Sequence, residues 1–181
     1  MTLENRSELA RVLTEHRRIG AVFARHAYGM RRWVELLGPR LAAVADPASR
    51  ELLAGLVADN ERHAALFRSR ARAHGIDPGA YSCPPEGEAI YVRMRELREL
   101  DDVLGYALGS LDHFAELLAV YAEGARGKDL AAIESVRGDV VRVRREMRGR
   151  VDAAARARYA EAHELYRVRE LAETALYTPA A

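Results

Sequence analysis

Cysteine is almost missing from this chain of 181 residues, in which Cys83 is the only one. A single thiol excludes an internal disulfide and a metal site built from several thiolates, and it fits a reducing cytosol. Runs of β-branched residues are scarce as well, and the apolar residues are mostly alanine, leucine and valine. This composition favours helices over strands.

A net charge of one sign is also missing, because 28 basic and 27 acidic residues leave a formal charge of +1. No overall field therefore favours a nucleic acid or an anionic membrane as a partner. The arginines between residues 137 and 150 are interrupted by acidic residues and lack an aromatic platform, so we expect no nucleic-acid binding. No stretch reads as a bilayer span, and residues 1–11 lack an apolar signal core. We expect a cytoplasmic protein without membrane contact.

The clearest pattern in the sequence is the helical spacing of its apolar residues. It predicts an all-α single domain, residues 1–181, with a four-helix bundle over 1–148. The predicted helices of the bundle cover residues 3–37, 47–74, 88–123 and 129–148. A further helix over 150–177 has a weaker apolar stripe. It packs either on the bundle or on another subunit, which would make the protein a homodimer.

Residues 75–88 contain the only long loop signal of the chain, with three prolines and three glycines. Fully extended, this segment reaches about 45 Å, whereas the helix before it spans roughly 40 Å. The segment can therefore travel the length of the bundle and start the third helix parallel to the second. A folded connection that turns back is the alternative that its length leaves open.

Two polar residues share the inner face of the second helix. Asn60 falls on the line of Leu53 and Phe67, and His63 falls on the line of Leu56. Counting residues from the predicted helix ends places His26 and Asp101 at the same depth, whereas His113 and Glu116 fall on an outer face.

Two imidazoles and one carboxylate can hold Fe(II), Mn(II) or Zn(II) and leave coordination positions open. We therefore expect His26, His63 and Asp101 to be metal ligands and Asn60 to orient a bound ligand or water.

The segment Asn60-Glu61-Arg62-His63 resembles the Glu-x-x-His half-site of the ferritin-like di-iron superfamily, which includes ferritins, rubrerythrins and di-iron oxygenases. In this resemblance His63 matches the motif histidine and Asn60 stands where the glutamate would be. Asp101 corresponds to the carboxylate of the third helix, and His26 lies near the level of the first-helix glutamate. The resemblance implies a ferritin-like bundle with a long crossover between its second and third helices, and a degenerate metal site.

The fourth helix has no Glu-x-x-His, because Arg137 stands in the histidine place of Glu134-Ser135-Val136-Arg137. Two functions therefore stay open. The protein is either a metal-dependent oxidoreductase with iron or manganese, or a metal-free bundle that binds a small molecule or a protein partner. In the second case the polar residues form a core hydrogen-bond network, and Asp101 pairs with Arg150 instead of a metal. The sequence does not decide whether the protein is an enzyme.

Overall fold

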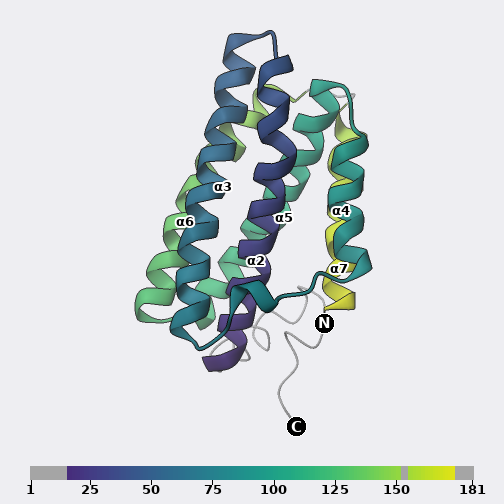
Figure 1. Ribbon diagram of the computed structural model, residues 1–181. Coiled ribbons are helices and arrows are strands. Elements are labelled where there is room, and N and C mark those ends of the chain that lie inside the picture. Colours follow the sequence, from purple (N-terminus) through teal and green to yellow (C-terminus); the bar gives the residue numbers. More distant parts are fainter. Residues whose placement is uncertain (1–15, 152–154, 174–181) are drawn as a thin grey trace.

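The computed structural model describes residues 16–151 and 155–173, and every regular element in these ranges is helical (Figure 1). The all-α prediction is therefore confirmed, while residues 3–15, 152–154 and 174–177 of the predicted helices lie outside the described residues. Short 3-10 helices at Gly38–Ala43 and Pro78–Ala80 lie in two connections. The α-helices are α2 (His16–Leu37), α3 (Pro47–Ala73), α4 (Pro85–Glu96), α5 (Leu100–Gly124), α6 (Gly127–Arg148) and α7 (Arg156–Ala172).

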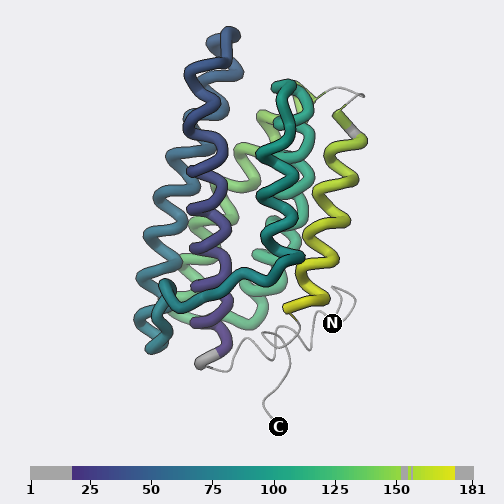
Figure 2. The backbone as a smooth tube through the Cα atoms, turned by 45° about the vertical axis from the view of Figure 1, so that its right-hand side comes forward, coloured from purple at the N-terminus to yellow at the C-terminus, as the bar shows by residue number. Residues whose placement is uncertain are grey.

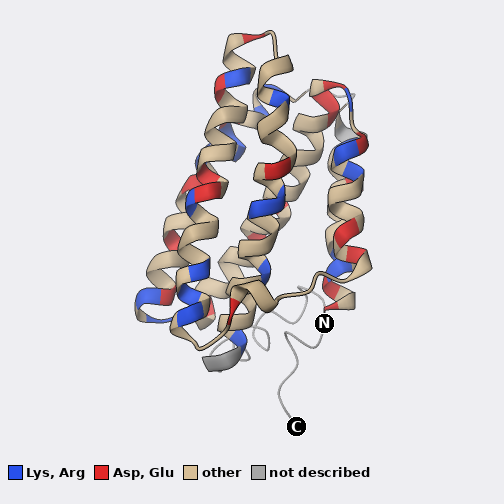
Figure 3. Cartoon of the chain, in the orientation of Figure 1, with Lys and Arg blue, Asp and Glu red and all other residues tan. Residues whose placement is uncertain are grey.

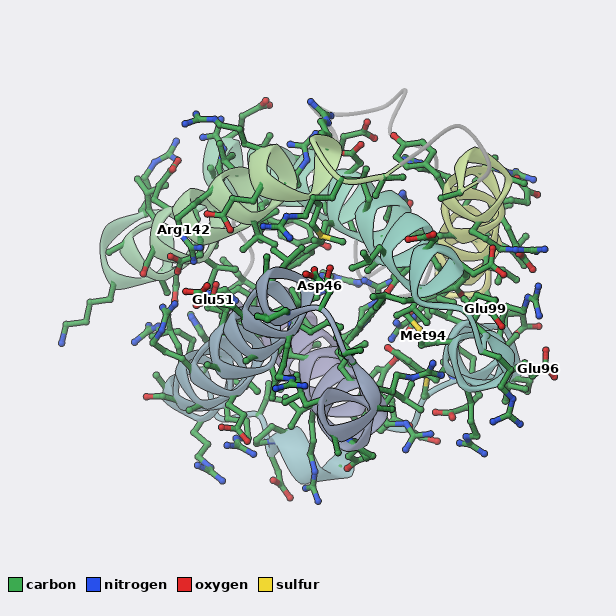
Figure 4. All side chains as sticks on the ribbon, turned by 90° about the horizontal axis from the view of Figure 1, so that it is seen from above. Asp46, Glu51, Met94, Glu96, Glu99 and Arg142 are labelled. Atoms are coloured by element: carbon green, nitrogen blue, oxygen red, sulfur yellow. The ribbon has the colours of Figure 1, made fainter. Side chains whose placement is uncertain are left out.

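The helices form a ring in which neighbours follow the order α2, α3, α6, α5, α7 and α4 (Figure 4). His63 meets Asp139 and Arg70 meets Asp129, so α3 and α6 run antiparallel. The turn between α5 and α6 is short, and these two helices are antiparallel as well. It follows that α3 and α5 run parallel to each other, as the tube in Figure 2 shows.

The single helix predicted over residues 88–123 is wrong, because the chain forms α4 and α5 with an extended turn between them. Leu97 leaves the helical conformation (φ −64°, ψ 129°) and stays buried. The guanidinium of Arg40 donates to the carbonyl oxygens of Met94 and Leu97, at 2.7 Å in both cases. These bonds satisfy carbonyl groups that the end of a helix leaves without a partner. Seen from this end, Met94 lies inside the ring and Glu96 lies at its edge (Figure 4).

The connection between α3 and α4 also differs from the predicted crossover. Residues 74–84 run across one end of the bundle rather than along it, and α4 then carries the chain to the opposite end (Figure 2). Ile90, Tyr91 and Met94 are the buried large side chains of α4. Because α4 supplies the return, α5 runs parallel to α3 although no extended segment spans the bundle.

The long helix α5 is apolar, and most of its residues are buried. Among the described helices it is the one that is long and apolar enough to cross a membrane, which the sequence prediction had excluded for every stretch. In this structure 72% of its most apolar window is buried inside the protein. A helix that is hydrophobic on all sides is expected where neighbours surround it, and α5 contacts both α6 and α7.

The helix α7 docks on the same chain, which is one of the two arrangements left open by the sequence. It packs against α5 and α4. Gly105 and Gly109 of α5 allow the close approach, since a Cβ atom at Gly109 would lie 2.4 Å from the carbonyl oxygen of Tyr159. Homodimer formation through this helix stays a prediction.

Candidate functional site

A cavity of about 60 Å³ lies where two hydrophobic clusters of the core meet. Met30 and Leu117 belong to one cluster, whereas Trp33 and Leu56 belong to the other. Its apolar wall consists of Met30, Trp33, Leu56, Leu111, Phe114 and Leu117. Its polar wall consists of His26, Asn60, Tyr91, Ser110, His113, Tyr166 and Arg169, and Gly29 also lines the cavity. The space suits a few waters or a small organic molecule.

His26 forms one side of the polar wall, from the middle of α2. Its Nε2 atom lies 2.8 Å from the hydroxyl of Tyr121 and 3.2 Å from Nη1 of Arg25, and its ring lies 5.0 Å from that of Phe114. Burial lowers the pKa of His26 well below the ordinary histidine value, and the nearby charges of Arg25 and Arg169 lower it further. The ring is therefore neutral at physiological pH.

His113 forms another part of the polar wall, from α5. The sequence placed it on an outer face, which is wrong: the ring is 3% exposed because α7 covers it. Its Nε2 atom lies 2.7 Å from the carboxylate of Glu170, and its ring stacks on Tyr166 at 5.2 Å between centroids. Glu116, three residues further on, is exposed as predicted.

A buried charge network backs the cavity, and Glu173 lies at its centre. The carboxylate accepts from Nε of Arg25 at 2.7 Å and from Nε of Arg169 at 2.8 Å, and it accepts from the hydroxyl of Tyr81. Arg169 also donates to the hydroxyl groups of Tyr91 and Tyr81. Burial alone would raise the pKa of Glu173, but the two guanidinium groups hold it below its usual value. Glu173 is therefore ionised, and the network joins α2, α4 and α7.

The structure brings together only part of the predicted metal site. His26 and Asn60 line the main cavity, while Asn60 and His63 line a smaller adjoining one. The side-chain amide of Asn60 donates to the carbonyl of Leu56 at 2.8 Å. Asp101 is exposed in the first turn of α5 and lines neither cavity. The set His26, His63 and Asp101 therefore does not form.

A different group has the geometry of a metal site. Ligand atoms of Asp59, His63 and Asp139 lie within 4.8 Å of one another, the one such group of histidine, cysteine and acidic residues found in the described ranges. Asp139 accepts from Arg62 at 2.9 Å, and Asp59 accepts from Arg142 at 2.7 Å. In Figure 3 acidic and basic residues lie near one another on α3. Two cations thus already neutralise both carboxylates, as the sequence analysis had considered for Asp101 and Arg150.

The sequence did not predict that several residues of these sites lie together. Asp59 and His63 are four residues apart on α3, so their shared face could have been noticed. Asp139 and Arg142 stand three apart on α6 and carry the same signal. Glu170 and Glu173 had no such signal, because nothing in the sequence fixes where α7 docks.

Two histidines whose pKa is lowered make stability depend on pH. Burial is the main cause for both His26 and His63. Each ring stays neutral in the folded state and binds a proton in the unfolded state below about pH 6.5, so stability is complete above that pH and falls as the pH decreases. We expect urea titrations between pH 6.5 and 5 to show that the free energy of unfolding decreases as the pH falls, by at most about 1.4 kcal/mol per pH unit for each ring. The variant His26→Gln should reduce this slope, and an unchanged slope would contradict the assignment.

Comparison with protein-family models, with curated proteins and with solved structures finds no match to this chain. The functional argument therefore depends on the geometry of the two sites.

Proposed function

We propose that the protein binds a small and mostly apolar molecule in the cavity between its two core clusters. The observation that carries this proposal is the cavity itself, which lies in a core whose residues, such as Phe23, Leu118 and Met94, are fully buried. Protein interiors rarely keep such a space, since unfilled volume costs stability. Apolar pockets with a few convergent polar groups are typical ligand sites.

The fold gives this proposal a framework. The ferritin-like arrangement inferred from Asn60-Glu61-Arg62-His63 is supported by the parallel course of α3 and α5, although α4 and not an extended crossover produces it. In this bundle arginine side chains, and not a metal ion, bind the carboxylates near His63. Arg62 and Arg142 bind the carboxylates beside His63. We infer a ferritin-like bundle that binds an organic ligand in place of a metal centre.

The single tryptophan of the chain makes the proposal testable, because Trp33 lines the cavity. Methylcyclopentane and cyclopentanol, each of six non-hydrogen atoms, should shift the fluorescence of Trp33 in a saturable titration. The variant Leu117→Phe fills the cavity and should abolish the shift while the protein stays folded. Leu130 on α6 does not line the cavity, so the control variant Leu130→Phe should still show the fluorescence shift. A titration without saturation for both probes, in a folded protein, would refute ligand binding in this cavity.

A metal-dependent function is the second candidate, and the group Asp59, His63 and Asp139 favours it. One imidazole and two carboxylates suit Fe(II), Mn(II) or Zn(II). If this function holds, purified protein contains stoichiometric metal that is lost in a folded His63→Ala variant. The variant Arg142→Ala frees Oδ2 of Asp59, while Arg62 still binds Oδ1. It should strengthen Zn(II) binding up to about fivefold, since an ion pair of this kind contributes up to about 1 kcal/mol. Arg137→Ala is the control, because that arginine pairs with Glu134. Metal-free protein with no calorimetric response to these ions would exclude the candidate.

A further inference from the structure

The two histidines of the cavity wall are held by partners of opposite kinds. His26 receives a hydrogen bond from Arg25, and an arginine can only donate, so Nε2 of His26 is an acceptor. In a neutral ring the proton is then on Nδ1. His113 faces the carboxylate of Glu170, which accepts, so Nε2 of His113 carries the proton. In its neutral form Nδ1 of His113 is then an acceptor.

The Nδ1 atoms remain available to a molecule in the cavity. The hydrogen bonds of both rings to other described residues use Nε2. Neither Nδ1 atom belongs to the buried side-chain atoms that lack a partner within the described residues, so both are within reach of a small molecule. The cavity therefore offers one N–H donor from α2 and one lone pair from α5.

The charges around the cavity indicate a neutral ligand. Arg25 and Arg169 are buried cations, and Glu170 and Glu173 are buried anions, so the charges of these four balance. Arg169 already donates to Glu173, Tyr91 and Tyr81. A charged ligand would have to be desolvated next to a wall that is neutral overall, which is costly.

We propose that the ligand is a small neutral molecule with a hydroxyl group, which donates to Nδ1 of His113 and accepts from Nδ1 of His26. Its apolar body contacts apolar residues of the lining such as Trp33, Leu56 and Leu117. This inference rests on the proposed function and adds the chemical class of the ligand. A hydroxyl group is the smallest group that both donates and accepts, so it matches the N–H of His26 and the lone pair of His113.

Three ring compounds of the same size separate the two hydrogen bonds in titrations of Trp33 fluorescence. Cyclopentanol donates and accepts, cyclopentanone only accepts, and methylcyclopentane does neither. The variant His113→Gln removes the acceptor at the position of Nδ1, while its amide NH2 can still donate to Glu170 from the position of Nε2. It should weaken cyclopentanol about tenfold, the effect of one buried hydrogen bond, and leave the other two probes unchanged. His26→Gln should weaken both cyclopentanol and cyclopentanone.

The control is His63→Gln, in which a glutamine also keeps a hydrogen bond to a carboxylate, that of Asp139, outside the main cavity. This variant should bind all three probes with the affinity of the wild-type protein. If methylcyclopentane binds while His113→Gln and His26→Gln affect all three probes equally, or none of them, the hydroxyl assignment is refuted and ligand binding in the cavity stands. If no probe binds to the folded wild-type protein, the proposed function fails and this inference fails with it.

Discussion

The variant Glu173→Ala is expected to lose about 3–5 kcal/mol of unfolding free energy, because it removes the carboxylate that binds two buried cations of the network. Arg25 and Arg169 are 1% and 3% exposed, so water cannot replace the carboxylate at either of them. Tyr81 would lose its acceptor as well. Urea unfolding at pH 7, followed by circular dichroism, measures the change, and the urea concentration at the midpoint should be much lower than for the wild-type protein.

Glu164→Ala provides the control, since Glu164 is exposed and pairs with Arg167 on the same helix face. We expect no measurable change there, as is usual for surface ion pairs. Glu173→Gln keeps an acceptor oxygen and removes the charge, so it should fold with an intermediate loss. A wild-type midpoint in both Glu173 variants would contradict the role given to the network.

The same network predicts a direction of acid sensitivity. The pKa of Glu173 is lowered in the folded state, so its stabilising contribution is present above the unfolded-state pKa and is lost as the pH falls through the lowered value. Because α7 carries Glu170 and Glu173 into the core, acid should release α7 from α4 and α2. In Glu173→Gln this part of the acid transition should be missing.

The sequence predicted the helices better than the site, for a physical reason. The α2–α3 hairpin has a short connection, so counting residues placed His26 and Asn60 at a common depth, and both line the cavity. Asp101 was counted along one continuous helix. The break at residues 97–99 makes it part of the first turn of α5, where it is exposed.

The position of α7 could not be deduced in this way. Its apolar stripe is weak, and helical periodicity does not tell which neighbour a helix with a weak stripe will choose. The sequence pattern therefore predicts His113 on the surface, whereas Tyr166 and Glu170 cover it in the structure. The local signal was in α5, where Gly105 and Gly109 stand four residues apart and mark a face that another backbone approaches.

That close approach gives the second large prediction. A glycine inside a helix usually costs stability, so replacing it by alanine normally stabilises a protein by up to about 1 kcal/mol. At Gly109 the sign should reverse, because the new Cβ atom would lie 2.4 Å from the carbonyl oxygen of Tyr159 and 3.0 Å from Cβ of Ala162. The nearest of these is a backbone atom and cannot rotate away. We expect Gly109→Ala to lose about 3 kcal/mol, the upper part of the range for overpacked cores.

Gly138→Ala on α6 is the matched control, because nothing lies within 4 Å of a Cβ atom there. It should leave the protein unchanged or slightly more stable. In Gly109→Ala the separation of α7 should also be visible directly. Trp33 donates to the hydroxyl of Tyr166 at 3.2 Å, so its emission should shift to the red as this bond breaks. Equal stability changes in the two alanine variants would show that α5 and α7 do not pack through this glycine. The position of α7, and with it that of Arg169 in the cavity wall, would then be contradicted.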